Sequence, residues 1–153
     1  MDPRENRAME LESGIAAFET KNFAHATKLL SPIAEEGNSD AMYRMAIMLQ
    51  NGLGCLANEE KAFEYMRRAA ENGLPLAMHA LGFMYFEGEC TEKNSDLCIE
   101  WFERAAAAGM MGSATTLGMI YEDGNIVQQD LKKAEEWYKK AGITKLENND
   151  KII

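Results

Sequence analysis

The chain repeats itself with a fixed period of 36 residues, and this feature constrains its fold more than any other. The stretch "YMRRAAENG" begins at Tyr65, "WFERAAAAG" begins at Trp101, and a shorter form, "WYKKAG", begins at Trp137. A constant period without insertions is typical of stacked structural units, none of which can bury its apolar face alone. We therefore interpret the chain as a repeat protein.

Each unit divides into two helical halves joined by a loop of about seven residues. The first halves begin at Ala41, Ala77 and Ser113, with "AMYRMAIMLQNGLG", "AMHALGFMYFEGEC" and "SATTLGMIYEDGNI". A glycine follows each first half, where it suits the left-handed conformation that ends a helix: Gly52, Gly88 and Gly124. A residue able to cap a helix N-terminus precedes each second half: Asn58, Asn94 and Asp130.

The second halves pair a large ring with a small residue one helical turn later. Tyr65, Trp101 and Trp137 precede Ala69, Ala105 and Ala141 by four residues each. We expect each ring to pack where two helices approach closely. The unit is therefore expected to be a helix, a loop and an antiparallel helix.

The motif A-x-x-x-L-G-x-x-Y-x-x-G, complete from Ala77 to Gly88, resembles the Sel-like repeat. So does K-A-x-x-W-Y-x-K-A from Lys133 to Ala141. This family is related to the tetratricopeptide repeat but has a longer inner loop, and the resemblance implies an all-α, right-handed α-solenoid of about eight helices, built from stacked antiparallel hairpins. The first unit departs from the motif at three positions: Met45, Ala46 and Leu49.

We expect a single repeat domain over residues 1–153. Residues 8–37 resemble a plain tetratricopeptide unit and are interpreted as an N-terminal cap, with family-like spacing of Gly14, Ala17, Phe23, Ala26, Leu30 and Ile33. The Sel-like repeats are placed at 41–76, 77–112 and 113–142, followed by a polar tail at 143–153. That tail is too polar for a firm capping helix, so we expect the last hairpin to be partly uncovered.

The net charge of −9, from 16 basic and 25 acidic side chains, argues against nucleic acid and anionic membranes as partners. It would favour a basic protein partner, or it serves solubility alone. No apolar run approaches the roughly 20 residues needed to span a bilayer. Because "MDPRENRAME" also lacks the features of a secretory signal, we expect a cytoplasmic protein.

Three cysteines occur, at Cys55, Cys90 and Cys98, and in the cytoplasm we expect reduced thiols. A hairpin would bring Cys90 and Cys98 near each other, but burial as small apolar side chains is the favoured interpretation. The regularly spaced cysteine pairs of secreted, cysteine-rich relatives are missing.

We expect no catalytic residues, no metal and no cofactor. "GLGCLA", from Gly52 to Ala57, fits a dinucleotide fingerprint but follows a helix instead of a strand. "DGNIVQQD", from Asp123 to Asp130, lacks the ligand pattern of a calcium loop. Only two histidines are present, and no serine is followed three residues later by lysine, so zinc and acyl-enzyme signatures are both missing.

The tetratricopeptide resemblance implies that the first helix of each unit lines a concave groove for a partner. By register, the expected contact residues are Tyr43, Ile47, Gln50, His79, Phe83, Phe86, Glu87, Thr115, Met119, Glu122 and Asp123. Phe83 and Phe86 are the informative pair: if Leu81 and Tyr85 face the core, the two phenylalanines are partly exposed anchors. The alternative is that both pack under a neighbouring helix.

The resemblance and the groove favour a non-catalytic module that binds another protein, with no small-molecule substrate. One form of this hypothesis is a cytoplasmic immunity protein that neutralises a basic bacterial toxin. An adaptor in assembly or signalling is the alternative. A second alternative, from a different class, is a binder of cell-wall fragments or β-lactams with weak hydrolase activity, for which the sequence offers no nucleophile–base pair.

Overall fold

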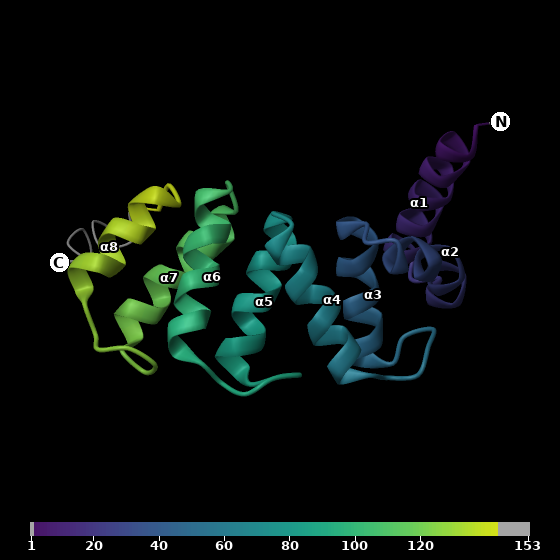
Figure 1. Cartoon of the computed structure of the whole chain (residues 1–153). Helices are drawn as coiled ribbons and strands as arrows, with labels where there is room; N and C mark the ends of the chain where they lie inside the picture. Colours follow the sequence, from purple (N-terminus) through teal and green to yellow (C-terminus); the bar gives the residue numbers. More distant parts are fainter. Residues whose placement is uncertain (1, 144–153) are drawn as a thin grey trace.

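The computed structural model describes residues 2–143, which form eight helices and no strand. They pair as α1 (Pro3–Glu19) with α2 (Phe23–Glu35), α3 (Ser39–Asn51) with α4 (Glu59–Glu71), α5 (Pro75–Glu87) with α6 (Ser95–Ala107), and α7 (Met111–Asp123) with α8 (Leu131–Lys140). The hairpins stand side by side in one row, and each helix packs on the next along the chain (Figure 1). The predicted all-α solenoid is confirmed; residues 144–153 of the predicted tail lie outside the described residues.

Two kinds of connection alternate along the row. Within the three repeats the helices are joined by residues 52–58, 88–94 and 124–130, loops of the predicted length that gather along the lower edge of Figure 1. Between hairpins, only residues 36–38, 72–74 and 108–110 intervene. The predicted caps are confirmed: the side chains of Asn58, Asn94 and Asp130 each accept a hydrogen bond of 3.0 Å from the backbone N–H three residues on.

The two helices of a repeat approach closely because a glycine of one faces a ring of the other. A Cβ added to Gly82 would lie 2.7 Å from Cε1 of Phe102, and one added to Gly118 would lie 2.6 Å from Cδ1 of Tyr138. Both rings are buried, at 0% and 3% exposed. The glycine of the repeat motif is therefore required by the ring that packs against it, and no larger residue fits without a shift.

This contact explains why the first repeat departs from the motif. Ala46 occupies the register position of Gly82, and Met66 occupies that of Phe102. Both are buried in one apolar cluster. A flexible methionine accommodates a methyl group that a rigid ring would not, so alanine is tolerated where the partner is not aromatic.

The row has a buried interior in two overlapping parts. One cluster runs from Ala17 in α1 to Ala105 in α6, and a second, from Cys98 to Tyr138, joins α6, α7 and α8. An aromatic ring occupies the same register position in all three repeats. It is 5% exposed in Tyr65 and 6% exposed in Trp101, but in Trp137 it is only half-buried. Trp137 lies in the last described helix, as expected for a hairpin that no later unit of the described chain covers.

The N-terminal hairpin is more extended than its sequence suggests. α1 begins at Pro3, upstream of residue 8, because the Asp2 side chain caps it by accepting a hydrogen bond of 2.9 Å from the N–H of Arg4. Pro32 lies inside α2 without ending that helix. Within residues 2–143, no helix has both the length and the hydropathy needed to cross a bilayer.

Candidate functional site

All eleven predicted contact residues lie on the first helices of the three repeats, α3, α5 and α7. Four of them meet at one pocket between α5 and α7: Phe83, Phe86, Met119 and Asp123. We call this hollow of about 210 Å³ the α5–α7 pocket. Four further residues complete its lining: Thr116, Ile120, Asn125 and Ile126.

Stacked rings form one wall of this pocket. The centroid of the Phe83 ring lies 5.0 Å from that of Phe102 and 6.2 Å from that of Phe86, and both contacts are edge-to-face. Phe102 is fully buried, whereas Phe83 and Phe86 are half-buried. The structure thus combines the two alternatives, exposed anchors and rings packed under a neighbouring helix. Phe83 packs edge-to-face on the buried ring of Phe102, and both Phe83 and Phe86 also line the hollow. A wall held in this way is preorganised.

The opposite wall comes from α7 and the loop that follows it. The Met119 side chain is 49% exposed, whereas that of the neighbouring Ile120 is 5% exposed. Asp123, at the end of α7, and Asn125 are both exposed. The pocket therefore has an apolar base and a polar rim with one carboxylate, a combination that marks interaction sites.

The positions that correspond to part of this lining between the first two repeats are joined by a hydrogen bond. Phe86 and Asn125 correspond in register to Gln50 and Glu89. There the Gln50 amide donates a hydrogen bond of 2.6 Å to the Glu89 carboxylate. A polar bridge thus spans the position that in the α5–α7 pocket is lined by a ring and an amide.

Other predicted contact residues are engaged within the protein. The Tyr43 ring packs near the Arg44 guanidinium, 5.7 Å from the ring centre, and burial raises the pKa of the tyrosine. The Glu122 carboxylate accepts a hydrogen bond of 2.5 Å from the Tyr138 hydroxyl. Thr115 donates its hydroxyl hydrogen to the backbone oxygen of Met111 at 3.3 Å. Ile47 is half-buried and Glu87 is exposed.

His79 makes a contact that the sequence did not predict. Its Nδ1 atom lies 2.6 Å from Oγ of Ser113, and burial lowers the pKa of the imidazole. Ser113 is 0% exposed, so its hydroxyl lies out of reach of a substrate. The position is alanine in the two earlier repeats, and the pair is a polar contact across the α5–α7 packing rather than a nucleophile with its base.

The three thiols are free, and they differ in burial. Cys98 is fully buried, which raises its pKa to about 12, whereas Cys55 and Cys90 are half-buried. Because the thiolate is the reactive form, we expect a thiol reagent at about pH 8 to label Cys55 and Cys90 in the native protein and Cys98 only after unfolding. Mass spectrometry of labelled peptides measures this, and rapid native labelling of Cys98 would contradict its burial.

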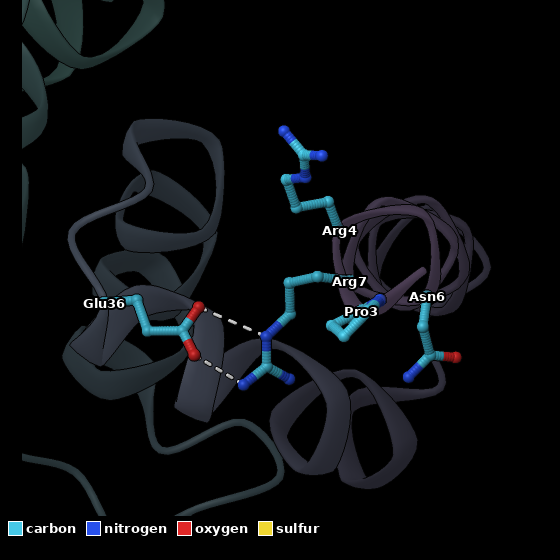
Figure 2. Close-up of a pocket in the computed structure, with 5 residues that line it drawn as sticks. All are labelled: Pro3, Arg4, Asn6, Arg7 and Glu36. Atoms are coloured by element: carbon cyan, nitrogen blue, oxygen red, sulfur yellow. Dashed lines mark hydrogen bonds and ion pairs between the residues drawn. The ribbon is translucent and has the colours of Figure 1, made fainter. Parts of the chain in front are cut away.

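A second hollow lies at the N-terminal end and is open to solvent. It is lined by Pro3, Arg4, Asn6, Arg7 and Glu36, with Arg7 bonded to Glu36 by two charge-assisted contacts (Figure 2). Arg7 also donates to Glu10. The cation is therefore already matched within the protein. The described residues also include no group of three His, Cys, Asp or Glu side chains placed to hold a metal ion.

The residues that sequence reasoning missed follow from packing between repeats. Thr116 and Ile120 lie on α7 beside predicted positions, but only the packed structure shows which neighbours line the hollow. Asn125 and Ile126 belong to "DGNIVQQD", a loop without the ligand pattern of a calcium site. The loss of helical periodicity after Gly124 left no rule for their direction.

Comparison with known proteins agrees with this architecture. A family model described as Sel1 repeat matches residues 39–74, 75–110 and 114–142. A Sel1 repeat protein from Oxalobacter formigenes is 26% identical with a TM-score of 0.78, covering 87% of this chain and 53% of that one. A protective antigen of uropathogenic Escherichia coli strains displaying an SLR fold is 31% identical with a TM-score of 0.79, covering 89% and 30%.

A more distant structure, the cysteine rich protein B of Helicobacter pylori, is 18% identical with a TM-score of 0.59 over 86% of this chain and 95% of that one, which shows likeness of fold alone. A search of curated proteins found no match. The chain spans about half of the Oxalobacter protein and under a third of the Escherichia antigen. Sel1 repeats generally form non-catalytic scaffolds for protein–protein interaction, and with three of them matched over most of its length, this chain belongs to the Sel1 repeat family.

Proposed function

We propose that this protein is a non-catalytic module that binds a partner protein across the first helices of its repeats, with the α5–α7 pocket at the centre of the contact. The exposure of Met119, 49% in a setting of half-buried phenylalanines, is the observation that supports it. Apolar groups left in contact with water and rimmed by polar ones are typical of interfaces, and aromatic anchors carry much of the binding energy there.

In its finer form, the proposal makes the partner a basic toxin and this protein the cytoplasmic immunity factor that neutralises it. The net charge of −9 supports a basic partner, because opposite charges speed association and favour the correct pairing. An immunity protein binds one toxin with a nanomolar Kd, whereas an adaptor binds several partners more weakly. Co-expression with a toxin encoded nearby separates the two, since only an immunity protein restores growth.

A hydrolase acting on cell-wall fragments or β-lactams is not part of the proposal. The serine that contacts a histidine ring, Ser113, is fully buried, and the α5–α7 pocket is lined by apolar groups with one carboxylate. Hydrolysis at a serine needs a nucleophile and a base that both reach the substrate.

The proposed function predicts the effect of Met119→Glu. A carboxylate forced against the apolar base of the pocket would be desolvated on binding, and we expect about a hundredfold or greater loss of affinity. The measurement is capture of partners from a lysate of the source organism by immobilised wild type and variant, followed by titration calorimetry with the purified partner.

Met111→Glu is the matched control. Met111 lies on the same helix, is 45% exposed and lies outside the pocket, so the variant repeats the charge change on a comparably exposed side chain. We expect it to capture the same partner as the wild type. Equal capture by all three proteins would remove the α5–α7 pocket from the interface, and capture of no protein by the wild type would refute the binding module.

A further inference from the structure

We propose that the α5–α7 pocket receives one large apolar side chain from a segment of the partner protein, and that a lysine or arginine next to it in that segment pairs with Asp123. This inference rests on the proposed function and gives the chemistry of the partner that the surface would select. It commits to a protein segment with an apolar anchor and an adjacent cation.

The size of the pocket fits one side chain. Its volume of about 210 Å³ exceeds the roughly 150 Å³ of an engineered apolar cavity that holds a benzene molecule. The rings of Phe83 and Phe86 and the flexible Met119 side chain suit an aromatic or branched aliphatic group, since methionine adapts its shape to the occupant. A polar group would be desolvated here with few hydrogen-bonding partners.

The charge around the pocket favours a cation beside that anchor. Asp123 is the charged residue of the lining, and Glu87, at the same register position one repeat earlier, is exposed. The pocket lies at the C-terminal ends of α5 and α7, which lead into the loops along one edge of the row (Figure 1). Helix C-termini carry partial negative charge that adds to that of the carboxylates.

Basic side chains offset the negative end of the helix dipole at the C-termini of the second helices of the repeats, but not at those of the first helices. Basic residues occupy the last turns of α4, α6 and α8, as Arg68, Arg104, Lys139 and Lys140, while the last turns of α5 and α7 contain none. A lysine or arginine brought by the partner would supply the missing positive charge.

The first two repeats suggest a variant that would place a polar bridge across the pocket. Between the first two repeats, Gln50 and Glu89 bridge the positions that Phe86 and Asn125 occupy in the α5–α7 pocket. The double variant Phe86→Gln, Asn125→Glu transplants this bridge. It uses a pair that the repeat already accommodates, and it makes the protein more acidic, so weaker binding of a basic segment could not come from lost charge.

The test uses the full chain as bait for a displayed library of short random peptides, followed by titration of the enriched synthetic peptides. We expect enrichment of a large apolar residue adjacent to lysine or arginine. Binding of these peptides should fall by about tenfold to a hundredfold in Phe86→Gln, Asn125→Glu, the loss expected when one apolar side chain is no longer buried. Circular dichroism and thermal melting confirm that the variant folds.

A separate pair of variants tests the proposed ion pair with Asp123. Asp123→Asn should weaken the same peptides by about two- to fivefold and reduce the salt dependence of binding. Glu64→Gln, on the exposed surface of α4, removes the same charge away from the pocket and should change neither property. Equal effects of the two variants would show general attraction by net charge and overturn the assignment of Asp123.

The outcomes separate this inference from the proposed function. Enriched peptides without an apolar–basic pair, peptides that bind the double variant as well as the wild type, or no enrichment at all would each overturn the inference. If Met119→Glu still loses a captured partner protein in those cases, the binding module stands and its partner has another chemistry. If the wild type also captures no partner protein, both the inference and the proposed function are refuted.

Discussion

Replacing Gly54 with alanine will destabilise the packing of the N-terminal hairpin on the first repeat. We expect no other single added methyl group to destabilise this packing more. Gly54 lies in the loop between α3 and α4 with a φ of +67°, and a Cβ there would overlap the backbone carbonyl of Phe23 and lie 2.8 Å from the amide nitrogen of Ala24. A backbone overlap has no rotamer to relax it. We expect a loss of about 2–5 kcal/mol, from about 1–2 for the left-handed conformation and the rest from overpacking.

Gly52→Ala is the matched control for this change. Gly52 lies in the same loop with a φ of +66°, but a Cβ there meets its nearest neighbour, Cβ of Ala57, at an ordinary 3.5 Å. It should cost only about 1–2 kcal/mol for the conformation. Because repeats interact mainly with their neighbours, hydrogen exchange should show faster opening of α1 and α2 in Gly54→Ala and little change in α8. Equal losses from the two variants would refute the close approach.

Gly82→Ala will destabilise the second repeat in the wild type and stabilise it when Phe102 is methionine. A Cβ at Gly82 lies 2.7 Å from the Phe102 ring, which is itself held by Phe83 at 5.0 Å and His79 at 5.5 Å between centroids. We expect about 2–3 kcal/mol of overpacking, offset by about 1 kcal/mol of better helix propensity, for a net loss of about 1–2 kcal/mol. In the Phe102→Met background, the overlap between the added Cβ and the ring disappears, and the gain in helix propensity from glycine to alanine remains.

A double-mutant cycle in chemical denaturant measures this coupling, which should reach about 2–3 kcal/mol. The first repeat already carries the rescued combination, Ala46 with Met66 at the same register positions. As a control, Ala46→Gly should only destabilise, by about 1 kcal/mol of lost propensity. If Gly82→Ala costs the same with phenylalanine or methionine at position 102, the ring is not what requires the glycine.

The candidate site was only partly predictable. Register alone placed Phe83, Phe86 and Met119 on the first helices, because positions 36 residues apart repeat their direction. The same rule predicted Gln50 as a contact residue, and its amide donates a hydrogen bond to Glu89. Matched positions share a direction, but their neighbours differ from one repeat to the next.

The sequence by itself determined the elements, because each depends on residues near one another in the chain. Periodic apolar positions formed the helices, Asn58, Asn94 and Asp130 capped them, and a period of 36 residues required them to stack. Which side chains line the pocket and which bond to one another was decided only by the tertiary structure. That outcome depends on side chains of different repeats that meet across a gap, Phe86 with Asn125 in one place and Gln50 with Glu89 in the other. At the same register positions one pair lines a pocket and the other forms a hydrogen bond, and this difference arises only when the helices are packed.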